Sequence, residues 1–443
     1  MSKVGIFGAG WVGLVTGACF ADLGHEVVIR DVVTEKIEAL QRGQVPFHEE
    51  DIPALLERNA ERLTYTLDAG AVADCEFLFV CVDTPPTYSG DADLSRVWAV
   101  IDELPELTGS RPVVVMKSTV PAGTGEKIRV GLDQRGLEHV GYASNPEFLA
   151  EGRAVRDFMN PDRIVVGAFD ADDGDAVAAL YSAIDAPVVR SDVNSAEMIK
   201  LAANAFLMTR ISFINEIANV CEATGADVVK VAEGIGLDRR LGPHFLRAGI
   251  GYGGSCFPKD SLALKQLASN SGYHFQLLSA VIEVNELQKR RVIGKLKRHL
   301  GPLQGKTVAL LGLAFKANTD DMREAPSIVL ASRLLAEGVE VRAWDPVADG
   351  ATLPKGVEVV SSVADAVRGA DAAVIVTEWD ELKGLASEET RRSMANPLIV
   401  DGRNLLDPEE TRRAGFAYEG IGRPAAPTGA LSQASEREPA REA

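Results

Sequence analysis

Short apolar runs alternate with amphipathic stretches through the first third of the chain. Four runs rich in β-branched residues are predicted to be buried strands, at residues 4–7, 26–30, 77–82 and 113–117. Helical patterns separate these runs, and such alternation is typical of βαβ units that build a parallel sheet. Two further short strands, at 142–144 and 163–169, are expected to extend the same sheet.

Long helices replace this alternation after about Asp192. Apolar residues recur at helical spacing over 194–224, without an internal proline or glycine, and predict one long helix that ends at Gly225. A second long helix is predicted over 275–300, before Gly301 and Pro302. A glycine-rich loop lies between the two helices.

Strand–helix alternation resumes after Gln304 and predicts a second α/β domain. The expected strands are at 307–311, 339–343, 373–377 and 398–400. From about Pro424 the sequence is rich in proline, alanine and glutamate without periodicity, which indicates disorder. The predicted fold class is therefore α/β, with domains at 1–191, 192–301 and 302–423 and a disordered tail at 424–443.

Composition excludes several classes of protein. The 443 residues include 46 basic and 64 acidic side chains, a formal net charge of −18, which argues against nucleic-acid binding. The sequence suggests neither a membrane span nor a signal peptide. Five scattered cysteines without a CxxC pair, and six histidines without a cluster, lead us to expect a cytoplasmic protein with no structural metal.

A glycine motif after the first predicted strand indicates a dinucleotide site. Gly8, Gly10 and Gly13, with Trp11 and Val12 between the last two, form a GxGxxG turn that opens a helix. These glycines permit a tight turn, close approach of a pyrophosphate and close helix–strand packing. Asp31 ends the second strand, where a carboxylate accepts from the ribose hydroxyls and favours NAD over NADP. Together they predict an N-terminal Rossmann domain. Lys36 either adds a contact or is a solvated helix position.

Two proline-containing loops follow the next predicted strands. Thr84 and Pro85 end one strand, and Thr119 follows another. Loops at the carboxyl ends of strands in such sheets line the ligand crevice. We therefore favour cofactor contact over plain turns that end at proline.

The glycine-rich segment 249–260 contains the candidate reactive residue, Cys256. Pro258 suits the first turn of a helix, which places Cys256 at the helix N-terminus, where a thiol pKa is lowered. Asp260 lies close enough to orient a water near the sulfur. We favour a nucleophile, and the alternative is an inert buried thiol.

Lys200 and Asn204 lie four residues apart on one face of the long predicted helix. A lysine in an apolar stripe is costly without a partner, and an oxyanion or alkoxide would be one. The alternative is a lysine that extends to solvent.

Eight motifs in this order are together similar to those of the UDP-glucose/GDP-mannose dehydrogenase family. They are GAGWVG, VDTPP, STVPAGT, NPEFLAEG, EMIKLAANAF, GIGYGGSCFPKD, LGLAFKANTDDMRE and DGRNLLD. The resemblance implies a four-electron, NAD-dependent oxidation of the C6 alcohol of UDP-glucose to a carboxylate, through a thiohemiacetal and a thioester on Cys256. It also implies a central dimerisation helix, a C-terminal Rossmann-like UDP-binding domain, and a homodimer or larger assembly.

The resemblance assigns roles to residues by their place in the motifs. It implies catalytic roles for Cys256, Lys200, Asp260, Asn204, Glu147 and Thr119. Implied cofactor contacts, besides the glycine motif, are Asp31, Lys36, Thr84, Pro85, Thr119, Glu151, Lys259 and Arg323. Implied substrate contacts are Glu147, Phe148, Leu149, Glu151, Lys200, Asn204, Arg240 (across subunits), Arg247, Tyr252, Gly253, Cys256, Phe315, Lys316 and Arg403.

Other functions remain open from the sequence. Dehydrogenases for GDP-mannose, UDP-N-acetylmannosamine or UDP-N-acetylglucosamine share the cysteine and lysine, although the motif forms favour UDP-glucose. A non-catalytic sensor of NAD or nucleotide sugars would be favoured by an altered Cys256, Lys200 or Asp260, and all three are intact. A two-electron dehydrogenase with an inert Cys256 is the remaining alternative.

Overall fold

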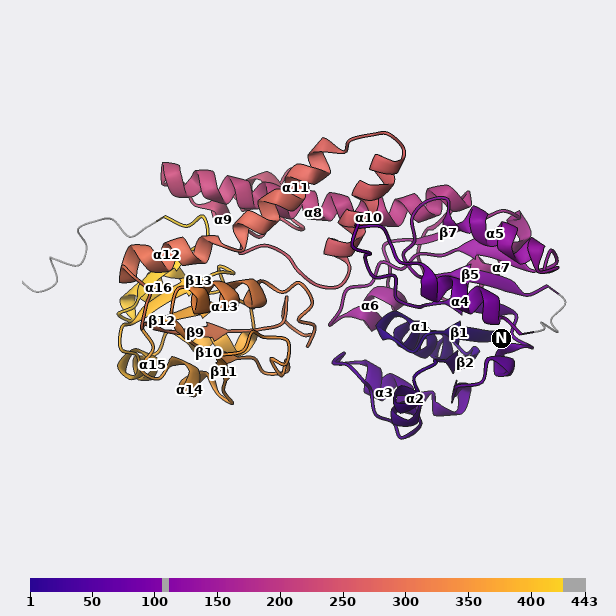
Figure 1. Ribbon diagram of the computed structural model, residues 1–443, viewed down its shortest axis with the longest axis horizontal. Coiled ribbons are helices and arrows are strands. Elements are labelled where there is room, and N and C mark those ends of the chain that lie inside the picture. Colours follow the sequence, from indigo (N-terminus) through magenta and orange to yellow (C-terminus); the bar gives the residue numbers. More distant parts are fainter. Residues whose placement is uncertain (106–110, 425–443) are drawn as a thin grey trace, which may run out of the picture. The chain divides into compact units, whose positions relative to one another are not determined.

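The computed structural model describes residues 1–105 and 111–424 (Figure 1). The predicted tail therefore lies outside the described residues, except for Pro424. The described chain divides into two compact units that are each assembled from separate stretches of sequence. The first unit consists of Met1–Met208, Gly253–Ile282 and Ala314–Glu324, and the second of Thr209–Tyr252, Glu283–Leu313 and the chain from Ala325 onward.

The first unit contains an eight-stranded sheet in the order β3-β2-β1-β4-β5-β6-β7-β8. Its strands are β1 (Lys3–Phe7), β2 (Glu26–Arg30), β3 (Leu63–Thr66), β4 (Phe77–Val80), β5 (Val113–Met116), β6 (Gly141–Ser144), β7 (Ile164–Ala168) and β8 (Val188–Ser191). Six of these correspond to predicted strands. The pattern missed β3 and β8, which are four residues long and only partly buried.

One pair in this sheet departs from the predicted parallel arrangement. β6 and β7 are antiparallel, and β8 then runs parallel to β7. The connection from Asn145 to Arg163 leaves the carboxyl end of β6 and enters β7 from that same edge of the sheet. Because it does not cross to the opposite edge, the NPEFLAEG motif stays beside the loops that follow β1, β4 and β5.

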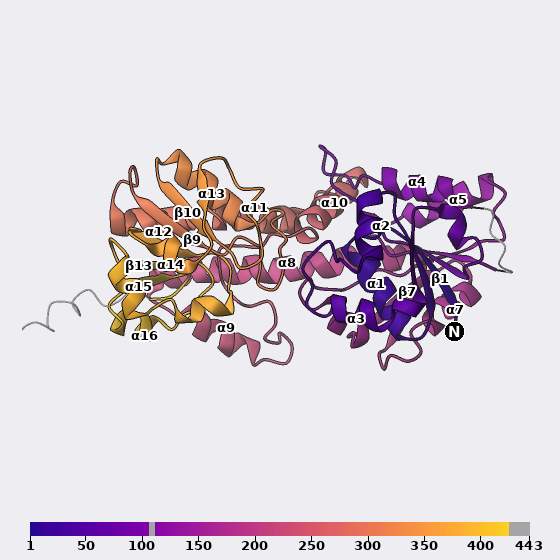
Figure 2. The same ribbon diagram turned by 90° about the horizontal axis from the view of Figure 1, so that it is seen from below.

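Helices cover both faces of this sheet, and Figure 2 shows α4 and α5 on one side and α1 and α3 on the other. Alternate side chains of β1 face opposite ways, so that Ile6 packs in an apolar cluster with α1, while Phe7 packs in another with α4 and α5. The helices that lie wholly in the first unit are α1 (Trp11–Asp22), α2 (Thr34–Gln41), α3 (Ile52–Arg58), α4 (Ser95–Glu103), α5 (Thr124–Gln134), α6 (Ala154–Met159), α7 (Ala171–Ala179) and α10 (Phe257–Asn270). Short 3₁₀ turns lie at Ala60–Arg62 and Ala69–Val72.

The first long helix is confirmed as α8 (Val193–Thr224), whose residues are shared between the two units. The prediction of a second continuous helix is wrong. It is divided into α11 (Gln276–Gln288) and α12 (Arg291–Leu300). At the break the amide of Arg290 donates to the carbonyl of Leu287, three residues back, which interrupts the α-helical ladder. Without a proline or glycine there, the pattern gave no signal of it.

The second unit contains a six-stranded parallel sheet in the order β11-β10-β9-β12-β13-β14. The strands are β9 (Thr307–Leu311), β10 (Glu340–Trp344), β11 (Val357–Val359), β12 (Ala372–Ile375), β13 (Leu398–Asp401) and β14 (Ala417–Gly420). Its other elements are α9 (Val228–Gly236), α13 (Pro326–Ala336), α14 (Val363–Val367), α15 (Glu388–Ser393), α16 (Pro408–Arg413) and a 3₁₀ turn at Asp380–Gly384. The four predicted strands are present, and the edge strands β11 and β14 were missed. No described helix is long and apolar enough to cross a membrane.

Candidate active site

The glycine motif between β1 and α1 has the geometry that dinucleotide binding requires. Gly8 has φ +104°, and a Cβ at that position would lie 2.7 Å from the carbonyl oxygen of Cys81. A Cβ at Gly13 would lie 1.8 Å from the carbonyl oxygen of Gly8, so the helix approaches the strand as closely as predicted. At Gly10, in contrast, a Cβ would meet nothing within 4 Å. The first and third glycines are thus fixed by packing, and the second leaves open space at the N-terminus of α1, where a phosphate binds favourably.

Asp31 lies beside this turn, at the carboxyl end of β2. Its carboxylate accepts hydrogen bonds from the amides of Ala9 (2.7 Å) and Val33 (3.0 Å) and from Lys36 Nζ (2.9 Å). Burial opposes ionisation, but the bonds from Lys36 and the two amides outweigh it and lower the pKa of Asp31. Lys36 therefore pairs with Asp31, and the anionic Asp31 fits a ribose that carries free hydroxyls.

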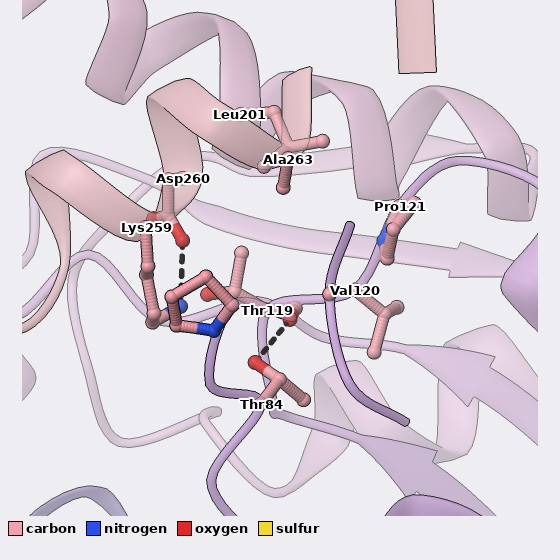
Figure 3. A pocket seen from close by; sticks show the side chains of 10 residues that line it. Thr84, Thr119, Val120, Pro121, Leu201, Lys259, Asp260 and Ala263 are labelled. Carbon is pink, nitrogen blue, oxygen red and sulfur yellow. Dashed lines mark hydrogen bonds and ion pairs between the residues drawn. The ribbon is translucent and has the colours of Figure 1, made fainter. Parts of the chain in front are cut away.

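Thr84 and Thr119 line a small pocket that faces α10 (Figure 3). The hydroxyl of Thr84 donates to the carbonyl of Thr119 (2.8 Å), and Lys259 and Asp260 lie on the other side of the pocket. The pocket has room for about one water molecule. Pro85, which follows Thr84, is half-buried.

A buried ion pair joins α8 to the segment after β6. Lys200 Nζ lies 2.8 Å from Glu147 Oε1, and each side chain is only 4% exposed. Burial favours the neutral forms, but the mutual attraction lowers the pKa of Glu147 and, with Cys256 and Asp260, raises the pKa of Lys200. Lys200 is thus a charged, paired lysine, and it does not extend to solvent as in the alternative interpretation.

The second position on this face of α8, Asn204, contacts Asp260. Asn204 Nδ2 donates to Asp260 Oδ2 (2.6 Å), while Lys259 Nζ lies 2.6 Å from Asp260 Oδ1. Asp260 is buried and lies in the first turn of α10. The predicted pair on α8 thus holds two carboxylates, Glu147 through Lys200 and Asp260 through Asn204.

Cys256 is the N-cap residue of α10 and Pro258 lies in its first turn, as predicted. Its Sγ lies 3.5 Å from the hydroxyl of Ser255. The expected lowering of the thiol pKa is wrong for this structure. Burial, and after it the charge of Glu147, raise the pKa of Cys256 to about 11, while Lys200 opposes the shift. The free protein therefore holds a neutral thiol here.

Glu151 forms a second polar cluster beside Ser255. It accepts from the hydroxyls of Ser255 (3.2 Å) and Thr319 (3.1 Å) and lies 3.6 Å from Arg323 NH2. Burial and the neighbouring charge of Asp321 raise the pKa of Glu151 to about 7. Three predicted site segments, around Glu151, Ser255 and Arg323, therefore meet within the first unit.

Residues 314–324 also belong to the first unit. The ring of Phe315 lies 2.9 Å from where a Cβ of Gly254 would be, so only glycine fits at position 254. Lys316 Nζ lies 5.4 Å from the centroid of the same ring. Phe315 and Lys316 are thus placed next to the cysteine loop.

The ring of Phe148 lies near two cations. The guanidinium of Arg163 is 3.5 Å, and Lys200 Nζ 5.4 Å, from its ring centroid. The amide of Leu149 donates to Glu147 (2.6 Å), which fixes the turn that carries both residues. Val12, in the first turn of α1, is partly buried and packs against the apolar core.

Four predicted substrate residues belong to the second unit, while Gly253 belongs to the first. Arg403 donates to the carbonyls of Val376 (2.7 Å) and Gly251 (2.9 Å) and so holds the glycine-rich loop. The amide of Tyr252 donates to Asn285 in the same unit. Arg247 is exposed, and Arg240 is exposed and pairs with Asp238.

One buried cation near Glu147 was missed by the sequence analysis. Lys117 Nζ donates to Asn145 Oδ1 and to the hydroxyl of Tyr181, both at 3.0 Å. Burial lowers the pKa of Lys117 to about 8, against the attraction of Cys81 and Glu147. The available signal was a lysine directly after the apolar run VVVM.

Known proteins resemble this chain over nearly its whole length. Models of the UDP-glucose/GDP-mannose dehydrogenase family match residues 2–185 (NAD binding domain), 194–287 (central domain) and 309–408 (UDP binding domain). A UDP-glucose 6-dehydrogenase of Pseudomonas aeruginosa is 46% identical, over 95% of this chain and 97% of its own. TuaD of Bacillus subtilis, a UDP-glucose 6-dehydrogenase, is 44% identical over 96% and 94%.

Solved structures extend the likeness to the whole fold. A UDP-glucose dehydrogenase from Pyrobaculum islandicum superposes with a TM-score of 0.88 at 36% identity, covering 96% of this chain and 98% of its own. A UDP-D-ManNAc dehydrogenase from Pyrococcus horikoshii superposes with 0.85 at 28% identity, covering 95% and 99%. From its sequence, its fold and its site, this chain belongs to the UDP-glucose/GDP-mannose dehydrogenase family.

Proposed function

We propose that this NAD-dependent dehydrogenase oxidises UDP-glucose to UDP-glucuronate, consuming two NAD⁺ and one water and releasing two NADH. The observation that carries the proposal is a thiol at a helix N-terminus beside the buried Glu147–Lys200 pair and the Asn204–Asp260 contact. A thiol retains an aldehyde as a covalent adduct, so that a second hydride can leave from the same carbon. The identity of the sugar nucleotide rests on relatives at 43–46% identity that are named UDP-glucose 6-dehydrogenases.

The first oxidation requires removal of a proton from the C6 hydroxyl. Because the pKa of Lys200 is raised, its ammonium stays charged and stabilises a developing alkoxide, but does not accept the proton. In this proposal a water between Thr119 and Asp260, for which the pocket there has room, takes up the proton and passes it to the Asp260 carboxylate. Asn204 orients the Asp260 carboxylate. NAD, when bound, accepts the hydride.

The thiol then adds to the aldehyde. Because the pKa of Cys256 is raised, the thiol passes its proton to the aldehyde oxygen as the C–S bond forms, and Lys200 stabilises the negative charge that develops on that oxygen. Loss of a second hydride and a proton gives the thioester. Water attacks that thioester, with Glu147 as the base, and releases the carboxylate and the free thiol.

The remaining predictions from the sequence extend this proposal. Glu151 and Arg323 are cofactor contacts in this proposal, and Phe148, Phe315 and Arg403 are contacts of the sugar nucleotide, as the family motifs imply. Arg240 is exposed, as a residue that reaches the substrate of a neighbouring subunit must be. We place the enzyme in the cytoplasm as a homodimer or larger assembly. Sedimentation of the purified protein tests the state of assembly.

The experiment is to count NADH formed per sugar nucleotide consumed. UDP-glucose, UDP-galactose, UDP-N-acetylmannosamine and GDP-mannose are compared in parallel. We expect two NADH per UDP-glucose and little from the others. One NADH per sugar would refute the thioester role of Cys256, a preference for another sugar would refute the substrate, and no NADH at all would favour a sensor.

A further inference from the structure

Glu49 is a buried carboxylate to which the sequence analysis assigned no role. It lies in the loop between α2 and α3 and is 3% exposed. Both of its oxygens are used. Oε2 accepts from Trp11 Nε1 (3.0 Å) and from the amide of Gly152 (2.8 Å), and Oε1 accepts from the amide of Ala154 (2.9 Å). Three donors from two distant segments thus converge on one carboxylate.

The two segments serve different parts of the site. Trp11 is the first residue of α1 and follows Gly10, where the open space for a phosphate lies. Gly152 directly follows Glu151, and Ala154 is the first residue of α6. Glu49 therefore connects the start of the cofactor helix to the segment that carries the site carboxylates.

The backbone at Gly152 has little room to move. Gly152 has φ +79°, and a Cβ there would lie 2.5 Å from the carbonyl oxygen of Asn318. The next residue along that loop, Thr319, donates to Glu151, which in turn accepts from Ser255 beside Cys256. A shift at Gly152 is thus passed to Glu151 and to the loops on both sides of it.

A neutral side chain of the same shape cannot replace the carboxylate. Glutamine has one accepting oxygen and one NH₂ group. If the glutamine oxygen faces Trp11 and Gly152, its NH₂ group faces the N–H of Ala154, and two donors then oppose each other. If the side-chain amide is turned over, the NH₂ group faces the donors of Trp11 and Gly152 instead. Either orientation opposes at least one backbone N–H of the 152–154 segment, whereas a carboxylate satisfies all three donors.

From these contacts we propose that Glu49 is a positioning residue, which sets the Glu147–Glu151 segment relative to the cofactor helix. The proposal rests on the dehydrogenase function given above. The proposal predicts separate effects on cofactor binding and on turnover. Trp11 belongs to the cofactor helix, whereas Gly152 and Ala154 belong to the segment that carries the site carboxylates. Loss of the Trp11 bond should change cofactor affinity, and loss of the backbone bonds should change turnover.

The experiment compares Glu49→Gln, Trp11→Phe and the control Glu50→Gln, an exposed glutamate one residue away. We expect Glu49→Gln to lower kcat at least tenfold, with KM for UDP-glucose changed less than threefold. Trp11→Phe keeps a ring but removes the donor, and should raise KM for NAD and Kd for NADH three- to tenfold, with kcat within twofold. Glu50→Gln should stay within twofold of the parent protein in every parameter.

The outcomes separate positioning from simple stabilisation. A folded Glu49→Gln protein with kcat within twofold of the parent would overturn the proposal. If Glu49→Gln does not fold, Trp11→Phe decides, and an unchanged Kd for NADH in that variant also overturns it. Titration with NADH needs no sugar nucleotide, so an inactive parent protein would refute the proposed function but leave the comparison of Kd for NADH between the parent and Trp11→Phe intact.

Discussion

Removing the cation of the buried Glu147–Lys200 pair should destabilise the first unit in a pH-dependent way. In Lys200→Met the apolar side chain fills a similar volume, but the Glu147 carboxylate loses its partner at 2.8 Å. Breaking a buried pair by removing one partner costs about 3–5 kcal/mol. Glu147 can limit this cost by taking up a proton, so that the loss of folding stability then depends on the pH.

The limit follows from linkage between protonation and folding. The ordinary pKa of this carboxyl is 4.5, and holding it protonated costs about 1.4 kcal/mol per pH unit above that value, or about 3.4 kcal/mol at pH 7 and about 1.4 kcal/mol at pH 5.5. For a large domain this corresponds to a fall in Tm of roughly 7–14 °C at pH 7 and roughly 3–6 °C at pH 5.5.

Lowering the pH reduces the loss of stability in Lys200→Met, but strongly acid pH should destabilise the parent protein. Its Glu147 has a lowered pKa, so the stability from this carboxylate is present above pH 4.5 and is lost as pH falls through the lower folded value. Lys200, whose pKa is raised, contributes below 10.5 and loses that contribution as pH rises through its folded value. Between pH 4.5 and pH 10.5 the ion pair therefore contributes its full stabilisation to the folded state.

Thermal unfolding of four proteins, each at pH 5.5 and pH 7, measures this effect. They are the parent, Lys200→Met, Glu147→Gln and the double variant. At pH 7 the double variant should be more stable than the sum of the two single losses predicts, because it buries no unpaired charge. Equal losses for Lys200→Met at the two pH values, or strictly additive losses, would refute the reasoning.

Three further predictions concern Cys256, Asp31 and Glu151. Cys256→Ser should abolish net turnover but retain UDP-glucose binding, as measured by calorimetry. In the parent protein, the rate of alkylation of Cys256 by iodoacetamide should still be rising at pH 9, since the thiol pKa is about 11. A plateau in that rate by pH 8 would contradict this. Asp31→Ala should reduce the NAD-over-NADP preference in kcat/KM at least tenfold, and an unchanged ratio would remove Asp31 from the ribose contact. Because the pKa of Glu151 is raised to about 7, its native carboxyl keeps a proton between pH 4.5 and 7 and costs stability as pH rises through that window. Glu151→Gln should therefore gain Tm relative to the parent between pH 5 and pH 8, and a constant difference would argue against the raised pKa.

Sequence reasoning succeeded where one residue type has one physical use. The glycines of the first turn, the uninterrupted helix α8 and the N-cap position of Cys256 follow from local chemistry, and the structure has them as predicted. The fold class followed from strand–helix alternation, which is also a local property.

Properties set by distant neighbours could not be predicted. The pKa of Cys256 depends on burial and on Glu147, which is more than a hundred residues away in the chain. Lys117 is stabilised by Asn145 and Tyr181, and nothing beside it in sequence reveals them. The direction of β7 depends on which edge of the sheet the preceding connection reaches, and periodicity does not encode an edge.

The discontinuous first unit has a consequence for synthesis. The chain passes between the two units five times, after Met208, Tyr252, Ile282, Leu313 and Glu324. On the ribosome, the sheet of the first unit is complete once β8 has emerged, but the cysteine helix and the 314–324 loop arrive only after parts of the second unit. A nascent chain that is stopped at residue 252 would therefore hold the dinucleotide turn without the thiol. We expect it to bind the cofactor before it can carry out any chemistry.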